Sequence, residues 1–444
     1  MIETVVASRG RAFAGTWFST FSGYINRMRG YQGLSTSTSW YSFLTRKTFV
    51  HNWTYPNGNY YAREFPIGWV GIDGNIVLEH ERESVSPLLS VLNQEDNKEN
   101  KENSVPIDDV PLSRGVAGLP MVKTPALIGA KRGHIECSVD VNDLAYWNDP
   151  QGERDIAFQS PFAEQEGKTK YISFEPDSGG WNNIRISLET IFILAAAMGR
   201  TLVMPPKQHL YLFNADGKKE RSFSNFFALQ NLELLKKVPI ITTEEFLRRE
   251  GGKDGQFPMP NENRTKLLNV QDSCQYRMKS EKSCFTLYFY LREAGLVPDL
   301  KSDKHCIIFD QDRFAGNSMS PEHAETADQF CGKREMFFID KEMQGHNLIH
   351  LQSSESAYRL LNHFYGFIHF TDPSIGNYYK RFVRDFMRYN AEIYCAAGKV
   401  VRALEEETKK LGLSPNEDGG FSSLHVRRGD LQYKEVKLPA EKWY

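Results

Sequence analysis

The sequence has little net charge, no long apolar run and no closely spaced cysteine pair. Its 444 residues carry a formal net charge of −2, so we expect no basic surface of the kind that neutralises a nucleic acid backbone. The longest strongly apolar run, Ile191 to Met198, is far shorter than the roughly 20 residues that cross a bilayer. Residues Met1 to Arg9 contain no apolar core of the kind found in a secretory signal. No nucleic acid partner, transmembrane segment or export signal is therefore predicted.

The six cysteines are scattered, and none of them stands in a CxxC pair. This spacing argues against a zinc ribbon or a thioredoxin-like centre. Cys274 and Cys284 are near enough in sequence to form a disulfide, and free buried thiols are the alternative.

Composition divides the chain into four segments. Residues 1–83 mix aromatic residues, glycine and short alternating runs, and form a region of unknown fold. Residues 84–130 are rich in Glu, Asn, Lys, Ser and Pro. Such a segment buries too little apolar surface to order itself, so a disordered low-complexity linker is expected. Residues 131–410 carry a regular pattern of strands and helices, and residues 411–444 add a connector and one new strand.

Short runs of β-forming residues alternate with helical segments after the linker. Lys170–Phe174 is predicted to be a strand, Arg185–Met198 a buried helix and Thr201–Met204 the next strand, which together make a βαβ unit. Since such a unit places its two strands in parallel, the predicted fold class is α/β with a parallel sheet. Also predicted are a short helix capped by Thr242 or Thr243 that runs through Leu247, and strands at Cys306–Phe309, Leu348–Leu351 and Phe421–Val426.

A long helix is predicted from Pro373, because apolar residues recur at three- and four-residue spacing on one face as far as Ala397. Its other face carries four basic residues, which we interpret as a solvated surface: Lys380, Arg381, Arg384 and Arg388.

The first candidate for chemistry is the loop and helix start from Asp177 to Arg185. Gly179 and Gly180 let the backbone approach a ligand closely, and a helix amino terminus favours an anion such as a diphosphate. Further hydrogen-bonding groups come from Asn182, Asn183 and Arg185. A tight turn without a ligand is the alternative.

The second candidate runs from His425 to Asp430, at the carboxyl end of a predicted strand, where ligands bind in open α/β sheets. Arg427 and Arg428 offer forked donors that suit phosphates, and Asp430 could orient one of them. A surface cluster of ion pairs is the alternative. A third candidate is Asp310 with Asp312, which could hold a divalent cation, although Arg313 offers an ion pair instead.

Taken in this order, the first two motifs resemble those of the GDP-fucose protein O-fucosyltransferases. The family's early Gly-Gly-X-Asn motif with a downstream Arg is matched by Gly179 to Arg185, and its His-X-Arg-Arg motif with a nearby acidic residue by His425 to Asp430. Arg200 to Pro206 looks like the family's second strand and proline pair. The likeness covers the chain from about Lys170 to Tyr444.

The resemblance implies a GT-B architecture, in which two Rossmann-like domains face each other across a cleft. Residues 131–410 would be the first Rossmann-like domain, and residues 411–444 the connector and first strand of an incomplete nucleotide-sugar-binding domain. The implied donor is GDP-fucose, the acceptor is a protein, and neither a metal nor another cofactor is required. The family's usual location is the secretory pathway, in the ER or Golgi.

The implied reaction is the inverting transfer of fucose to a Ser or Thr hydroxyl, during which charge grows on the departing diphosphate. Arg427 would stabilise that charge as the catalytic residue. The implied donor-binding residues are Gly179, Gly180, Trp181, Asn182, Asn183 and Arg185 from one domain and His425, Val426, Arg427, Arg428 and Asp430 from the other. Two other functions stay open: an inactive GDP-sugar-binding or scaffold protein, and a metal-dependent sugar transferase that uses Asp310 and Asp312.

Two features depart from the family's pattern. Some relatives have a glutamate base where Gly179 stands here, so a base must come from elsewhere or be unnecessary. The family's second domain continues past its arginine motif, whereas this sequence ends at Trp443-Tyr444 and is expected to be truncated. The strand Phe421–Val426 would then lack neighbouring strands, so we expect the chain to bind GDP-fucose poorly and to transfer nothing.

Overall fold

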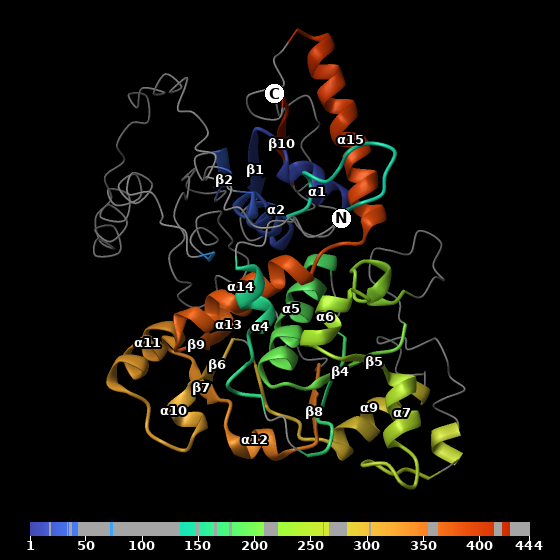
Figure 1. The fold of residues 1–444 in the computed structure, drawn as a ribbon, viewed down its shortest axis with the longest axis vertical. Coiled ribbons are helices and arrows are strands. Elements are labelled where there is room, and N and C mark those ends of the chain that lie inside the picture. Colours follow the sequence, from blue (N-terminus) through green and yellow to red (C-terminus); the bar gives the residue numbers. More distant parts are fainter. Residues whose placement is uncertain are drawn as a thin grey trace, which may run out of the picture.

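The structure is an arrangement of parallel sheets and helices (Figure 1). This computed structural model describes residues 1–16, 19–32, 34, 38–42, 72–73, 134–146, 151–163, 167–176, 180–207, 221–260, 262–265, 282–301, 303–353, 363–412 and 420–426. Within these ranges, every pairing between the named strands is parallel, which confirms the α/β class. No helix in this described part is long and apolar enough to cross a membrane.

The first sheet has the strand order β5-β4-β3-β8. The predicted βαβ unit is confirmed as β3 (Tyr171–Phe174), α5 (Trp181–Ala197) and β4 (Thr201–Met204), and α5 begins at Trp181 rather than at Arg185. The other two strands are β5 (Ile240–Thr242) and β8 (Leu348–Leu351). β3, β4 and β8 are buried along their whole length, including their polar residues Ser173, Thr201 and His350.

The second sheet has the order β7-β6-β9. Its strands are β6 (His305–Phe309), β7 (Glu335–Phe338) and β9 (Ile368–Phe370). A disulfide between Cys306 and Cys331 ties β6 to helix α11 (Pro321–Cys331), a link that the sequence analysis did not anticipate. The pairing considered for Cys274 and Cys284 lies outside the described residues.

Other helices between residues 152 and 367 are α4 (Gly152–Ala157), the 3-10 turn Phe223–Asn225, α6 (Leu232–Lys237), α7 (Thr243–Glu250), α9 (Lys282–Ala294), α10 (Gln311–Phe314), α12 (Lys341–Gly345) and α13 (Phe364–Phe367).

The third sheet joins the two ends of the described chain. Its order is β10-β1-β2, formed by β10 (Ser422–Leu424), β1 (Ala12–Thr16) and β2 (Ser39–Ser42). Figure 1 shows these strands at one end of the molecule together with α1 (Ile2–Ser8), α2 (Thr20–Tyr31) and α15 (Ala391–Lys410). The expectation that the strand Phe421–Val426 lacks neighbours is therefore wrong, because the amino-terminal strand β1 pairs with it. The expected weak binding of GDP-fucose, which depended on that absence, loses its basis.

The predicted domain boundaries remain predictions, and the expected linker 84–130 lies outside the described residues. One apolar core nevertheless runs through both ends of the molecule. It contains Tyr24 and Met28 of α2, Leu188 of α5 and Val401 of α15. Helix α2 is thus packed into the same core as the βαβ unit.

The long helix predicted from Pro373 is two helices, α14 (Pro373–Phe386) and α15. The chain breaks between them because Tyr389 pairs with Phe227 in an isolated bridge and the Asn390 N–H donates to the carbonyl oxygen of Phe226. The interpretation of the basic face as solvated is also wrong, since Arg381 and Arg384 are 9% and 3% exposed.

Partly buried carboxylates explain why these arginines face inward. Arg381 donates twice to the Asp155 carboxylate, at 2.7 and 2.9 Å. Arg384 donates to Asp73 at 2.8 Å and to Asp385 at 2.7 Å. Charged residues at helical spacing therefore mark a set of buried ion pairs here.

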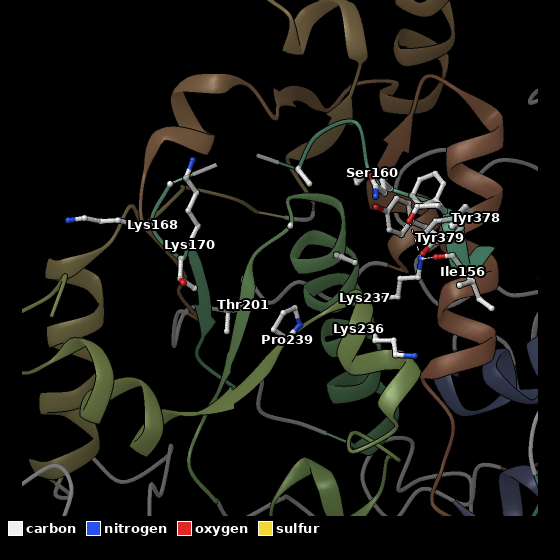
Figure 2. Close-up of a pocket in the computed structure, with 18 residues that line it drawn as sticks. Ile156, Ser160, Lys168, Lys170, Thr201, Lys236, Lys237, Pro239, Tyr378 and Tyr379 are labelled. Carbon is white, nitrogen blue, oxygen red and sulfur yellow. Dashed lines mark hydrogen bonds between the residues drawn. The ribbon is translucent and has the colours of Figure 1, made fainter. Parts of the chain in front are cut away.

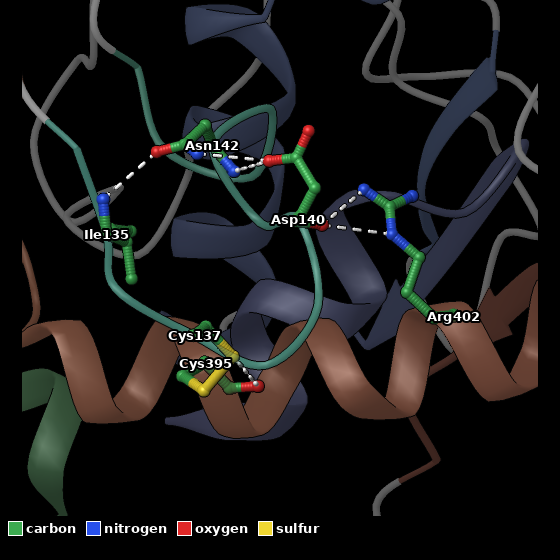
Figure 3. Close-up of a disulfide and its surroundings, with 6 residues drawn as sticks. All are labelled: Ile135, Cys137, Asp140, Asn142, Cys395 and Arg402. Atoms are coloured by element: carbon green, nitrogen blue, oxygen red, sulfur yellow. Dashed lines mark hydrogen bonds between the residues drawn. A yellow bond between two sulfur atoms is a disulfide. The ribbon is translucent and has the colours of Figure 1, made fainter.

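Residues 134–146, which we call the strap, are fastened to α15 (Figure 3). Cys137 of the strap forms a disulfide with Cys395, and the guanidinium of Arg402 donates to the carbonyl oxygen of Asp140 at 2.8 and 3.1 Å. The strap packs closely on Gly398, where a side chain would collide with Val141. These contacts fix the strap along the helix.

Candidate functional site at the junction of α2 and α5

The first motif lies where the sequence analysis expects it, at the carboxyl end of β3 and the amino end of α5. Gly180 precedes the helix in an extended conformation, and Asp177 to Gly179 lie outside the described residues. Trp181 is 8% exposed, packs on Phe227 and donates its indole N–H to the Tyr389 hydroxyl at 3.3 Å. Its side chain therefore anchors the start of α5 in the core.

The polar residues of the motif face in two directions. The Asn183 side-chain oxygen accepts a hydrogen bond from the Thr20 hydroxyl at 2.9 Å. Arg185 is fully buried, donates to the Asn182 side-chain oxygen at 3.4 Å and forms an ion pair with Glu189 inside the core. The Asn183 side chain thus faces helix α2, and the Arg185 guanidinium pairs with Glu189 in the core.

The second motif begins directly after β10. The His425 N–H donates to the carbonyl oxygen of Ala14 at 2.8 Å, which extends the pairing with β1. Its imidazole Nδ1 shares a hydrogen bond of 2.7 Å with the Ser22 hydroxyl, and its ring lies 4.8 Å from that of Phe21. Val426 is the last described residue here, and Arg427, Arg428 and Asp430 lie outside the described part.

The first turn of α2 brings the two motifs together. Thr20 contacts Asn183 of the first motif, and Ser22 contacts His425 of the second. We call these four residues the α2–α5 junction. Because α2 and α5 both begin here, the positive dipole ends of two helices meet at one place. Such an arrangement is suited to binding an anion.

The sequence analysis missed the contribution of α2. A signal was present: the strand β1 is followed by Ser19, whose hydroxyl caps the helix by accepting from the Ser22 N–H at 3.4 Å. A strand followed by a capped helix is the start of a second βα unit. It was overlooked because it stands so far in sequence from His425.

The candidate metal ligand Asp310 already has three partners. Its carboxylate caps α10 by accepting from the Arg313 N–H at 2.8 Å, and it also contacts the Thr371 hydroxyl and His323 Nδ1, each at 2.7 Å. Burial alone would raise the pKa of Asp310, but these hydrogen bonds lower it. Asp310, Asp312 and His323 place potential ligand atoms within 4.8 Å of one another. The cap and its partners account for the buried carboxylate without an ion.

Ser173, His350 and Glu175 form a second buried polar chain. His350 contacts the Ser173 hydroxyl at 2.8 Å and the Glu175 carboxylate at 3.1 Å, as in a nucleophilic triad. All three residues are at most 4% exposed, so a substrate has no access to the hydroxyl. Burial would raise the pKa of Glu175, but hydrogen bonds from His350 and Arg292 lower it. The chain is therefore a structural link between β3 and β8.

A cavity of about 580 Å³ opens elsewhere, at the amino ends of β3 and β4 (Figure 2). Figure 2 shows Lys170 and Thr201 at these strand ends, with Lys237 and Tyr378 on the other side. The Lys237 ammonium donates to the carbonyl oxygens of Ile156 and Phe158, which holds the wall together. Ligands of parallel sheets bind at the carboxyl ends of the strands, so this cavity is on the edge opposite to the expected one.

The fold and the junction define an α/β protein with a candidate anion site where two helices begin beside a sheet end. A family model described as GDP-fucose protein O-fucosyltransferase matches residues 171–442. The chain therefore belongs to the GDP-fucose protein O-fucosyltransferase family. No curated protein and no solved structure matches it.

Proposed function

We propose that this chain is a glycosyltransferase that moves fucose from GDP-fucose to Ser or Thr hydroxyls of a protein, with inversion and without a metal. The observation that carries the proposal is the α2–α5 junction, where Thr20 contacts Asn183 and Ser22 contacts His425. Two motifs that bind one ligand must lie at one place, and Thr20 and Ser22, both in the first turn of α2, contact one motif each.

The diphosphate of the donor would lie at the amino ends of α2 and α5, where helix N–H groups and both dipoles favour negative charge. Arg427 and Arg428 follow Val426 at the carboxyl end of β10 and would add two guanidinium groups there. In this proposal Arg427 stabilises the charge that develops on the leaving diphosphate, with Asp430 orienting the arginine pair. Gly179 and Gly180 would let the backbone approach the donor, and His425 would line its site.

The same proposal assigns the chain to a GT-B type enzyme of the secretory pathway. The sheet of β1, β2 and β10 would belong to the nucleotide-sugar-binding half, and the sheet of β3, β4, β5 and β8 to the other half. The disulfides Cys137–Cys395 and Cys306–Cys331 support an oxidising compartment, since such bonds are rare where thiols are kept reduced.

Calorimetric titration with GDP tests the proposal. We expect the purified chain to bind GDP, and a Thr20→Val/Ser22→Ala variant to bind about tenfold more weakly, because the variant loses both hydrogen bonds of the junction and each contributes about 0.5 to 1.5 kcal/mol. Ser320→Ala is the matched control, since Ser320 caps α11 far along the chain and its loss should leave GDP binding unchanged.

A transfer assay with labelled GDP-fucose separates the three functions. Loss of transfer in Arg427→Ala, with Asp310→Ala still active, supports the proposed enzyme. GDP binding without transfer would favour the inactive binding protein. A requirement for Mn²⁺ together with loss of activity in Asp310→Ala would favour the metal-dependent transferase. Absence of GDP binding by the intact chain would refute the proposal.

A further inference from the structure

A buried carboxylate stands between two buried arginines where α2 meets α5. Glu189 Oε2 accepts from Arg27 Nη1 at 2.7 Å, and Glu189 Oε1 accepts from Arg185 Nη1 one helical turn earlier on α5. Arg27 and Arg185 are fully buried and Glu189 is 1% exposed. Within the described residues, the Glu189 carboxylate therefore bridges two buried guanidinium groups.

An aromatic ring and an imidazole also contact the two guanidinium groups. The ring of Tyr24 lies 3.6 Å from the Arg185 guanidinium, and His363 Nδ1 lies 3.2 Å from Arg27 Nη2. A buried ion pair stabilises a protein little compared with apolar residues of the same size, but it fixes the geometry of the groups that it joins. The main effect expected of Glu189 is therefore on the positions of Arg27 and Arg185, rather than on the free energy of unfolding.

Three contacts follow one another in the same order along both helices. Thr20 contacts Asn183, Tyr24 contacts Arg185 and Arg27 contacts Glu189. The helices therefore lie side by side and begin at the same end. The contact to Glu189, two turns from the start of α2, determines where the first turn of α2 lies against the first turn of α5.

We propose that Glu189 is a positioning residue for the donor site: by holding Arg27, it places Thr20 and Ser22 of α2 against Asn183 and His425. The α2–α5 junction then depends on a group that touches no ligand. This inference rests on the proposed function for its effect on GDP binding, but the placement of α2 is independent of any ligand.

Two variants test the proposal, and each removes a different part of the contact between Glu189 and Arg27. Glu189→Gln keeps the shape and removes the charge, whereas Arg27→Met removes the contact to α2 and leaves Arg185 and Glu189 paired. Arg27→Met leaves Glu189 paired with Arg185, so it serves where Glu189→Gln fails to fold. Glu245→Gln is the control, because Glu245 forms the same kind of pair with Arg249 on an exposed surface of α7.

Two measurements on the intact chain are needed. In both test variants we expect GDP affinity to fall at least tenfold, and amide hydrogen exchange in residues 20–31 to become at least tenfold faster, with α7 and α11 unchanged. The control should match the wild type in both. A role in stability alone would lower the melting temperature but leave the GDP affinity of the folded protein and the protection of α2 unchanged, and this would overturn the proposal.

Hydrogen exchange also separates this proposal from the function on which it rests. If the wild type does not bind GDP, the proposed function fails, and faster exchange of α2 in the variants still supports the placement by Glu189. If the wild type binds GDP and both variants bind it equally well with α2 equally protected, the positioning role is refuted and the proposed function stands.

Discussion

Two glycines in helix interiors should respond in opposite directions to the same substitution. Gly398 lies in α15, where an added Cβ would meet Val141 Cγ1 at 2.1 Å and Leu144 Cδ1 at 3.1 Å. Gly376 lies in α14, where the nearest neighbour of an added Cβ is Phe370 Cβ at 3.9 Å. The two positions share a helical backbone and differ in the space beside it.

Replacing glycine by alanine in an open helix increases the free energy of unfolding by about 0.5 to 1 kcal/mol, because the unfolded chain loses freedom. Gly376→Ala should show this gain. At Gly398 the gain is outweighed by overpacking, which typically costs about 1 to 3 kcal/mol. The strap cannot simply retreat, since the Cys137–Cys395 disulfide holds it one turn earlier on α15. We expect Gly398→Ala to be destabilised by roughly 1 to 2 kcal/mol.

Equilibrium urea unfolding, followed by tryptophan fluorescence, compares both variants with the wild type. A Gly398→Ala protein that is as stable as Gly376→Ala would show that the strap does not pack on α15, and the reasoning would fail. Repeating the measurement after reduction adds a second test. With the disulfide open the strap can shift, so the cost of Gly398→Ala should become smaller.

Two further predictions concern buried charges. Burial, with a smaller effect from His323, lowers the pKa of His369 from 6.5 to about 4; the unfolded state then binds more protons between these values, and stability should fall as the pH falls from 6.5 towards 4. Thermal unfolding at pH 7 and pH 5 should show a smaller loss for His369→Asn than for the wild type, and an equal loss would contradict the assignment. Arg384→Ala should destabilise the protein by about 3 to 5 kcal/mol, because it leaves the carboxylates of Asp73 and Asp385 without that cation. Arg248→Ala, which opens the exposed pair with Glu244, should cost less than about 1 kcal/mol in the same urea experiment and serves as the control.

Local patterns predicted the elements that depend on local chemistry. The strands β3, β4, β6 and β8 follow from short runs of β-forming residues, and the helix α7 from the cap at Thr242, whose hydroxyl accepts from the Glu245 N–H at 3.1 Å. The glycine-bearing connection between β3 and α5 was likewise predictable, but Asn183, expected in the loop, lies in the first turn of the helix. Each of these features is decided by residues within a few positions of one another.

Features that depend on distant residues were not predictable in this way. The pairing of β1 with β10 joins Ala12 to Ser422, and neither short strand specifies its partner. The inward position of Arg384 depends on Asp73, and no helical pattern distinguishes a buried ion pair from a solvated charge. The disulfide of Cys137 with Cys395 has a sequence separation of 258, which spacing rules do not address.

The pairing of β1 with β10 also sets the order in which the protein can be completed during synthesis. Ala12 leaves the ribosome first, but its partner Ser422 follows about 410 residues later. At about 5 to 20 residues per second, the interval is roughly 20 to 80 seconds. During this time one edge of the sheet that contains β1 stays unfilled. Until α5 emerges, Arg27 also lacks its contact with Glu189. The α2–α5 junction can thus be completed only after His425 has been synthesised, and nascent chains released earlier would lack the second motif.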